Sequence, residues 1–347
     1  MKRLLSLLYG FCVFIRNWLY DKGICQEHTS DIPTISVGNV AVGGTGKTPQ
    51  TEYLLRLLSE QFKVAYLSRG YKRNTHGFVL ADDTATDASI GDEAMQIHIK
   101  FPAIPVAVDE DRLQGIALLQ QQIPDLQVVI LDDALQHRQL RAGLNLLMTR
   151  ADNLYVKDYF LPYGRLRDSI TTANRANMIV VSNCPRDLKP IDKRLIEKEL
   201  HILPYQQLYF TSIKYGVPYP LFPDSVNSAD SKLDGSNNKS GAALLTGIAD
   251  SKALYEHLRQ QYPDIRVFSF ADHHKFTKKD LDLLKYRNRI FTTEKDAARL
   301  LCMSELSEQM KARFYVVPIE IAFLDKQQEK QFNNKIIAYV TESNRNS

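Results

Sequence analysis

The segment from residue 35 to residue 58, ISVGNVAVGGTGKTPQTEYLLRLL, constrains the fold more than any other part of the chain. A short aliphatic run leads into a glycine-rich turn that ends in Gly46-Lys47-Thr48, and an amphipathic stretch follows. Strand, glycine-rich turn and helix in this order form a phosphate-binding loop, in which backbone N–H groups and the helix N-terminus hold phosphate oxygens. The first glycine of the usual pattern falls on Ala41, so the loop is of the GGxGKT variety.

The loop predicts a binding site for the phosphates of a nucleotide and for Mg²⁺. Lys47 is expected to reach the β- and γ-phosphates, and the Thr48 hydroxyl is expected to bind Mg²⁺. The residues predicted to contact the nucleotide are Gly43, Gly44, Thr45, Gly46, Lys47, Thr48 and Pro49.

A second acidic feature follows the buried run Val128–Leu131. Asp132 and Asp133 come directly after this expected strand. In a parallel sheet the strand ends lie beside the nucleotide, so one carboxylate is expected to hold Mg²⁺ and the other to position a ligand. A plain turn with two aspartates is the alternative.

Short aliphatic strands alternate with helices along the first 200 residues. This rhythm predicts a P-loop-type parallel sheet with helices on both faces. The expected strands are Thr34–Val37, Lys63–Leu67, Ile104–Val108, Val128–Leu131, Leu144–Met148 and Met178–Val181, and the expected helices are Thr48–Gln61, Asp92–Lys100 and Arg112–Gln122.

The pattern is interrupted by a polar, turn-rich stretch at 218–240 and then resumes as a smaller α/β unit. The extended stretches Gln207–Lys214 and Phe314–Ala322 flank this unit and are expected to pair as a ribbon. The resulting domains are an interfacial helix at 1–24, a kinase-type domain at 25–206, a linker of 207–216 and 314–323, a smaller domain at 217–313, and a tail at 324–347.

The first 24 residues carry four basic residues and one acid, a net charge of +3. The whole chain has 44 Lys and Arg against 40 Asp and Glu, so nearly all of its excess of +4 lies here. The apolar run Leu4–Ile15 is too short to span a bilayer. We therefore expect a helix lying on an anionic membrane surface rather than a nucleic-acid partner. A helix packed on the protein's own core and a secretory signal are the alternatives.

Eight further segments occur in the order found in one family, and together they are specific. They are SVGNVAVGGTGKTP (36–49), LSRGYKR (67–73), GDEAMQI (91–97), DDALQHR (132–138), LPYGRLRDS (161–169), LLTGIAD (244–250), FADHHKFT (270–277) and TEKDAARL (293–300). The chain resembles the tetraacyldisaccharide 4′-kinase family.

The resemblance implies a lipid kinase. Such an enzyme transfers phosphate from ATP to the 4′-hydroxyl of a tetraacyldisaccharide 1-phosphate, in lipid A and lipopolysaccharide biosynthesis. It implies two α/β/α domains joined by a two-stranded linker, and a monotopic enzyme on the cytoplasmic face of the bacterial inner membrane. No obligate protein partner is evident.

The resemblance also implies a catalytic pair. Asp92 matches the carboxylate that accepts the acceptor's proton, and His273 matches the histidine that supports it. They come from different domains, so domain closure would assemble them. By themselves, Asp92 also suits a helix N-cap and His273 a surface loop.

Four more residues are candidates for binding the substrate: Arg69, Arg165, Arg167 and Asp168. Arginine binds phosphate through two parallel hydrogen bonds. Asp168 stands where the family usually has Glu. Ala134 and Leu135 replace a glycine and an aromatic residue of the family pattern, which raises a question about local packing.

Three other classes share some of these features. A P-loop switch ATPase would have the loop and a membrane helix, but it leaves the GDE and DHH segments unexplained. A GTPase would use a motif such as Thr277-Lys-Lys-Asp280, although these residues also suit a helix capping box. A soluble small-molecule kinase would not need the first 24 residues.

Overall fold

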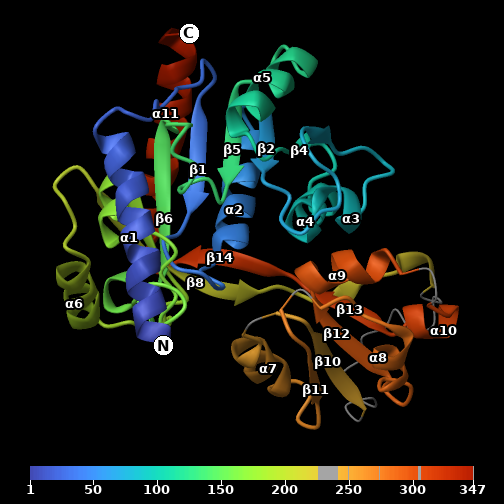
Figure 1. The fold of residues 1–347 in the computed structure, drawn as a ribbon. Coiled ribbons are helices and arrows are strands. Elements are labelled where there is room, and N and C mark those ends of the chain that lie inside the picture. Colours follow the sequence, from blue (N-terminus) through green and yellow to red (C-terminus); the bar gives the residue numbers. More distant parts are fainter. Residues whose placement is uncertain (226–240, 249, 273, 304–305, 347) are drawn as a thin grey trace.

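The computed structural model describes residues 1–346 except 226–240, 249, 273 and 304–305 (Figure 1). Its helices are α1 Lys2–Asp21, α2 Lys47–Ser59, α3 Asp87–Ile90, α4 Asp92–Lys100, α5 Arg112–Gln122, α6 Pro190–Leu200, α7 Lys252–Arg259, α8 Lys278–Asp282, α9 Glu294–Leu301, α10 Glu308–Lys311 and α11 Lys326–Asn346. Short 3₁₀ turns lie at Tyr155–Lys157, Ile170–Arg175 and Pro223–Ser225.

The strands form two sheets. They are β1 Thr34–Gly38, β2 Val64–Ser68, β3 Val79–Leu80, β4 Val106–Val108, β5 Val128–Asp132, β6 Leu144–Arg150, β7 Met178–Ser182, β8 Gln207–Tyr215, β9 Tyr219–Pro220, β10 Ala242–Thr246, β11 Arg266–Ser269, β12 Arg289–Thr293, β13 Phe314–Val317 and β14 Ile319–Phe323.

The larger sheet has nine strands in the order β14-β8-β7-β6-β1-β5-β2-β4-β3. Only the edge strands β3 and β14 run antiparallel to their neighbours. The central strands are buried on both faces, which is why they read as continuous aliphatic runs in the sequence. The parallel α/β architecture expected from the sequence is therefore present.

Helices α2, α4 and α11 pack on one face of this sheet, and α5 and α6 pack on the other with irregular segments between 151 and 176. For Lys326–Ser347 the sequence predicts a polar helix and a loose tail, and the structure contains the helix. Most of this segment forms α11, in which Phe332, Ile336 and Val340 are fully buried against α2 and the sheet. The apolar residues recur every four positions, so they form one stripe in an otherwise polar helix.

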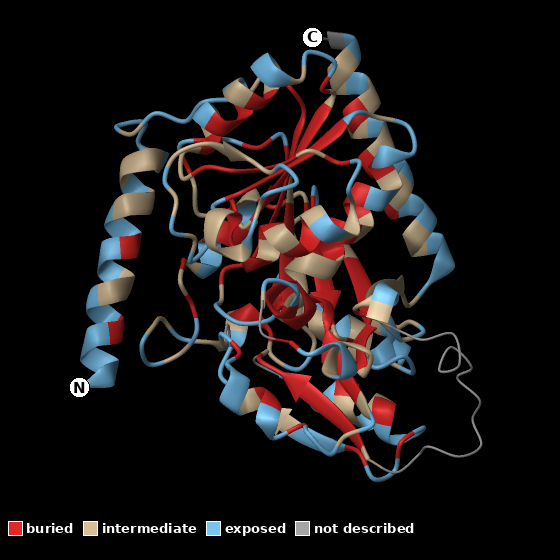
Figure 2. Ribbon diagram, turned by 90° about the vertical axis from the view of Figure 1, so that its right-hand side faces the viewer, coloured by how far each residue is buried: buried red, intermediate tan, exposed pale blue. Residues whose placement is uncertain are grey.

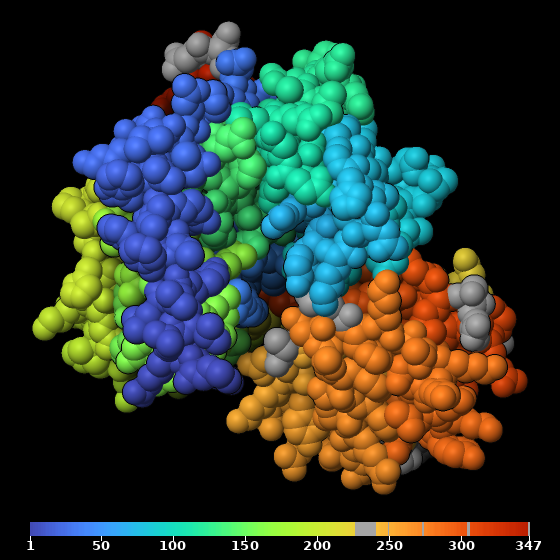
Figure 3. All heavy atoms as spheres, viewed as in Figure 1, coloured from blue at the N-terminus to red at the C-terminus, as the bar shows by residue number. Residues whose placement is uncertain are grey.

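The smaller sheet has the order β11-β10-β12-β13-β9, and all but β9 are parallel. Helix α7 covers one face, and α8 and α9 cover the other. This unit lies beside the ends toward which β1 and β5 point (Figure 1). The surface is hollowed between the two units (Figure 3).

The chain passes between the sheets at two points. β8 pairs antiparallel with β14, with Tyr215 opposite Ile319. The expected ribbon strand at 314–323 is divided by Pro318, so that β13 joins the smaller sheet and β14 the larger one. Proline has no N–H for a sheet ladder, which explains the break. The division into domains at 25–206 and 217–313 stays a prediction.

Helix α1 stands at the margin of the large unit and is exposed over most of its surface (Figure 2). Its inner side contacts the segment 160–168: Ser6 Oγ donates to the Phe160 carbonyl at 2.7 Å, and Tyr9 Oη donates to the Arg167 carbonyl at 3.0 Å. Within the described part of the chain, no helix is long and apolar enough to cross a membrane.

Candidate active site

The phosphate loop connects β1 to α2, as the sequence predicts. Gly46 caps α2 with a φ of +81°, a left-handed conformation that glycine adopts without strain. A Cβ at Gly46 would also lie 3.4 Å from Ser182 Cβ. Ser182 Oγ donates to the Thr45 carbonyl at 2.8 Å, and Asn39 Nδ2 donates to Thr45 Oγ1 at 2.8 Å. These bonds fix the loop to the ends of β1 and β7.

A second segment supports the loop from behind. Ala41 forms an isolated antiparallel bridge with Leu166, and the Val42 N–H donates to the Arg165 carbonyl at 2.8 Å. The Arg167 N–H donates to the Val40 carbonyl at 2.9 Å. The segment LPYGRLRDS is thereby held against the phosphate loop.

Four side chains from these segments form one charged cluster. Lys47 Nζ lies 3.4 Å from Asp133 Oδ1 and 3.4 Å from Asn39 Oδ1. Arg167 binds both carboxylate oxygens of Asp133, with Nη1 at 2.7 Å from Oδ2, and its Nη2 also contacts Asn39. Burial by itself would raise the pKa of Asp133, but Lys47 and Arg167 outweigh it and hold that pKa well below its ordinary value. Asp133 is thus a carboxylate that organises two cations beside the loop.

Asp132 has a different environment. Tyr66 Oη donates to its Oδ2 at 3.0 Å, whereas Oδ1 is buried with no hydrogen-bond partner among the described residues. Burial and the nearby charge of Glu93 raise the pKa of Asp132 to about 7, with Lys47 opposing them. A buried, unpaired carboxylate oxygen next to a phosphate loop fits a divalent cation, which would supply the missing positive charge.

The described residues contain no group of three or more His, Cys, Asp or Glu side chains suited to a metal held by protein alone. That finding agrees with the chemistry of Mg²⁺ in kinases, which takes one or two protein oxygens together with phosphates and water. Thr48, at the start of α2, and Asp132, at the end of β5, remain the predicted Mg²⁺ ligands, whereas Asp133, the third predicted ligand, is paired with Lys47 and Arg167.

The two departures from the family pattern after Asp133 are both accommodated in the interior. Ala134 and Leu135 are buried, and Leu135 joins the cluster that contains Val40 and Leu147. A Cβ on Gly38 would lie 2.6 Å from Leu135 Cβ, so glycine at the end of β1 makes room for this leucine.

Asp92 lies at the junction of the two units. It is the first residue of α4 and is 8% exposed, and the N-cap is Gly91 rather than Asp92. Its Oδ2 accepts hydrogen bonds from Arg299 of α9, from Nη2 at 2.8 Å and from Nε at 3.3 Å. Arg299 also donates to Asp296 Oδ1 at 2.8 Å. The smaller unit therefore orients this carboxylate.

Two further ion pairs join α4 to α9. Lys100 Nζ lies 2.6 Å from both Glu52 of α2 and Glu294 of α9, and Lys295 Nζ lies 3.6 Å from Glu93. Burial and the charge of Glu294 raise the pKa of Glu52 to about 7, although Lys100 lowers it. Glu294 and Lys295 of the TEKD segment therefore contact α4. Asp296 of the same segment is buried and accepts a hydrogen bond from Thr293 Oγ1 at 2.7 Å.

His273 lies outside the described residues. The adjacent His274 stacks on Phe270 and contacts Asp280 Oδ2 at 3.0 Å through Nε2. Thr277 and Asp280 form the capping box of α8. This structural role accounts for the superficial match to a guanine-reading motif.

The other proposed substrate residues are spread around the loop. Arg69 is exposed at the end of β2, and Arg165 is exposed and pairs with Asp158 at 3.2 Å. Asp168 is fully buried and contacts α1: Asn17 Nδ2 donates to its Oδ1 at 2.9 Å, and Arg16 Nη2 lies 3.1 Å from its Oδ2. Of the four, only Arg167 joins the cluster around Lys47.

Sequence reasoning did not assign Asn39, Tyr66 or Arg299 to the site. Asn39 directly follows the first strand, and Arg299 stands three residues after Asp296 on one helix face, a spacing that signals an ion pair. No spacing in the sequence indicates that Arg299 would reach Asp92, 207 residues away. Tyr66 lies within a strand that reads only as core.

The parallel sheet, the glycine-rich loop with Lys47 and the acids at the end of β5 define a P-loop nucleotide-binding protein of the α/β class. A family model described as tetraacyldisaccharide-1-P 4′-kinase matches residues 2–339. The chain belongs to this family.

Relatives with that name cover nearly the whole chain. A tetraacyldisaccharide 4′-kinase of Bacteroides fragilis (strain YCH46) is 47% identical over 350 residues, which is 98% of this chain and 93% of the relative. One from Flavobacterium johnsoniae is 42% identical, covering 97% of this chain and 96% of the relative. The crystal structure of LpxK from Aquifex aeolicus in complex with ATP superposes with a TM-score of 0.71, covers 97% of each chain and is 23% identical. That likeness confirms the fold.

Proposed function

We propose that this protein transfers the γ-phosphoryl group of ATP to the 4′-hydroxyl of a tetraacyldisaccharide 1-phosphate. The proposal rests on the way in which the charged residues of the site come together. A phosphate loop, an acid pair and Arg167 meet at the junction of two units, in a chain 47% identical to a named tetraacyldisaccharide 4′-kinase.

Different residues of the site would bind the phosphates and the Mg²⁺ ion of the nucleotide. Lys47 and Arg167 supply positive charge for the phosphates, and Asp133 holds both in place until phosphate oxygens replace part of its contacts. Thr48 and Asp132 would hold Mg²⁺, which neutralises charge on the β- and γ-phosphates when it is bound. Backbone N–H groups of the loop would bind the phosphate oxygens, and for this the Thr45 N–H, which donates to the Gly43 carbonyl at 2.9 Å, would have to exchange its partner.

The acceptor hydroxyl must lose a proton as it attacks phosphorus. Asp92 is the proposed base, because Arg299 holds its carboxylate at the junction and the adjacent Glu93 is close enough to Asp132 to raise the pKa of that acid. Arg299 orients that carboxylate from the smaller unit. We keep His273 as the group that supports Asp92. A change in the angle between the units would then alter the position of the base relative to the phosphate loop.

The decisive experiment is transfer of labelled γ-phosphate from ATP to purified tetraacyldisaccharide 1-phosphate in mixed detergent micelles. We expect a labelled bis-phosphorylated product whose formation ATP supports and GTP does not. Hydrolysis of ATP at the same rate with and without the acceptor, and no labelled lipid, would contradict the proposal and favour a switch ATPase.

We also propose that α1 lies on the anionic cytoplasmic face of the inner membrane. Its outward side carries a stripe of exposed apolar residues, at the positions Leu4, Leu7, Leu8, Phe11, Phe14 and Trp18. Basic residues flank the stripe, and the opposite side of α1 contacts the segment behind the phosphate loop. A lipid acceptor held at this surface would therefore be close to the site.

Replacing the outer side of α1 tests this placement without removing the helix. Deleting residues 1–24 would also break the contacts with Arg167, Asp168 and Arg138, so substitutions are preferable. Leu7→Gln, Phe11→Gln and Phe14→Gln together should weaken binding to vesicles that contain phosphatidylglycerol by more than about tenfold, since each buried side chain of this kind contributes about 1.5–3 kcal/mol.

The matched control changes two exposed apolar residues of α6, Ile191→Gln with Leu195→Gln, and should leave vesicle binding unchanged. Flotation with liposomes measures both variants. Equal flotation of the α1 variant and the wild type would rule out the proposed membrane contact.

A further inference from the structure

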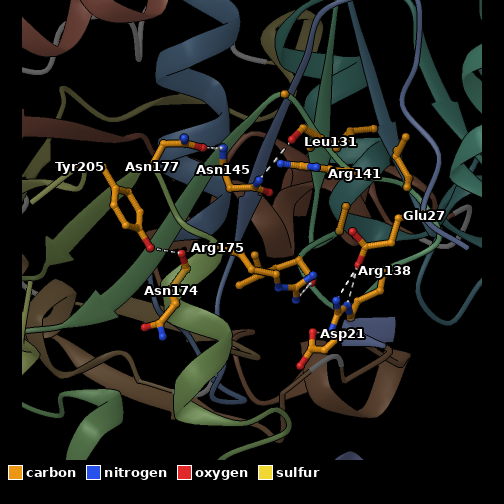
Figure 4. A pocket seen from close by; sticks show the side chains of 15 residues that line it. Asp21, Glu27, Leu131, Arg138, Arg141, Asn145, Asn174, Arg175, Asn177 and Tyr205 are labelled. Carbon is orange, nitrogen blue, oxygen red and sulfur yellow. Dashed lines mark hydrogen bonds and ion pairs between the residues drawn. The ribbon is translucent and has the colours of Figure 1, made fainter. Parts of the chain in front are cut away.

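A cavity of about 430 Å³ lies under the C-terminal half of α1, away from the phosphate loop. It is bounded by the end of α1, by the connection from β5 to β6, and by the segment 174–177 before β7 (Figure 4). Neither the loop residues 43–48 nor Asp92 line it. Three arginines do: Arg138, Arg141 and Arg175.

Arg138 is already neutralised. Its Nη2 lies 2.6 Å from Glu27 Oε1, and its Nη1 lies 2.8 Å from Asp21 Oδ1 and 3.1 Å from the Asn17 carbonyl. Figure 4 shows the contacts with Glu27 and Asp21 on one side of the cavity. This buried arginine therefore attaches the end of α1 to the domain and leaves no charge of its own for a ligand.

Arg175 is placed differently. Its Nη2 donates to the Leu135 carbonyl at 2.8 Å, and within the described residues no carboxylate forms an ion pair with it. Burial and the positive charge of Arg138 lower the pKa of Arg175, and the more distant carboxylates of Asp168 and Glu27 oppose them without reversing the shift. Arg141, at the edge of the cavity, is exposed, and the described residues give it no ion pair either. The lining thus has three arginines against two carboxylates, and no carboxylate of the described residues lies within ion-pair distance of Arg175 or Arg141.

We propose that this cavity binds a phosphate group, either free or as the headgroup of an anionic lipid. A half-buried guanidinium without an ion-pair partner is unfavourable, and an oxyanion between Arg175 and Arg141 would relieve it. Asn174 and Asn177 add amide groups to the same wall. At about 430 Å³ the cavity is large enough for a phosphate ester. Because α1 forms its roof, occupancy would stabilise the position of that helix.

The test measures how fast phenylglyoxal modifies Arg141 in the full-length protein, with peptide mapping by mass spectrometry. This readout is local, so phosphate bound at the phosphate loop does not affect it. Millimolar inorganic phosphate should slow the modification of Arg141, by about fivefold when phosphate is at about four times its Kd. Arg175→Gln should abolish the protection. Arg194 on α6 is exposed and serves as the internal control, with an unchanged rate.

A second arm distinguishes the source of the phosphate. Vesicles of phosphatidylcholine with phosphatidylglycerol replace inorganic phosphate, in the wild type and in Arg175→Gln. Protection that requires Arg175 in this arm identifies a lipid headgroup, and protection by inorganic phosphate alone identifies a free anion. If Arg175→Gln fails to fold, Arg141→Gln with Arg175 as the measured site replaces it.

The proposal is overturned if neither probe slows modification of Arg141 in the wild type. It is also overturned if protection survives in a folded Arg175→Gln variant, since a membrane that merely covers the surface would protect Arg141 in both proteins.

Discussion

Replacement of Lys47 with alanine should lower kcat by about 10²–10³-fold, the usual effect of removing one preorganised donor to a developing charge. Lys47 is the cation that the phosphate loop places beside Asp133, 3.4 Å from Oδ1. Without it, Arg167 alone would face the γ-phosphate, and the charge of Asp133 would be less well balanced. The measurement is turnover of ATP and the tetraacyl acceptor at saturating concentrations of both.

The fold should survive this substitution. Asp133 keeps both hydrogen bonds from Arg167, and the loop keeps its bonds through Asn39 and Ser182. A matched control is Lys63→Ala, which removes an exposed lysine whose distance to Asp125 is 3.8 Å. Such exposed pairs contribute little, so this variant should behave as wild type. A Lys47→Ala enzyme with near-normal kcat and a normal melting curve would refute the role given to this residue.

Replacement of Asp92 with asparagine should lower kcat by about 10²–10⁴-fold, the range for loss of a general base. Asparagine can still accept the hydrogen bonds from Arg299, so the junction keeps its shape while the proton acceptor is lost. The free energy of unfolding should fall by no more than about 1–3 kcal/mol, because a charged partner is replaced by a neutral one. Asp83→Asn, at an exposed position in the same region, is the control and should change neither quantity.

A double-mutant cycle tests whether His273 acts with Asp92. If the two form one unit, Asp92→Asn combined with His273→Ala should lose little more activity than the more damaging single change. Arg299→Lys keeps the positive charge beside Asp92 but loses the bidentate contact. It therefore tests whether the orientation of the Asp92 carboxylate, rather than the neighbouring charge, is required. Near-full turnover by Asp92→Asn would show that the base is another group.

The local features of the site were predictable because they depend on residues close together in the chain. The order of strand, glycine-rich turn and helix predicts β1, the loop and α2. The bounds of α4 and α5 match the expected Asp92–Lys100 and Arg112–Gln122. Such elements follow from hydrophobic periodicity and from turn residues such as Gly46.

Elements that depend on distant partners were less predictable. Helix α6 was not expected, because its residues are mostly polar and only Leu200 is buried. Helix α11 is predicted as a polar helix, but its packing on the larger sheet through Phe332, Ile336 and Val340 depends on distant residues. The stretch 314–322 reads as one strand, yet Pro318 sends its halves to different sheets.

The sequence by itself determined that this chain holds phosphate with a loop at the end of a parallel strand, and that its N-terminal segment is basic and apolar. Each of those two properties depends only on residues that are contiguous in the chain, so it can be predicted without knowing the tertiary contacts. Only the tertiary structure gave Asp132 and Asp133 different surroundings, a tyrosine beside the first and two cations beside the second. It also placed Arg299 of the smaller unit on Asp92, and Arg175 without an ion-pair partner beneath α1. Burial and charge pairing across long separations set these roles, because both depend on which distant side chains share one low-dielectric environment.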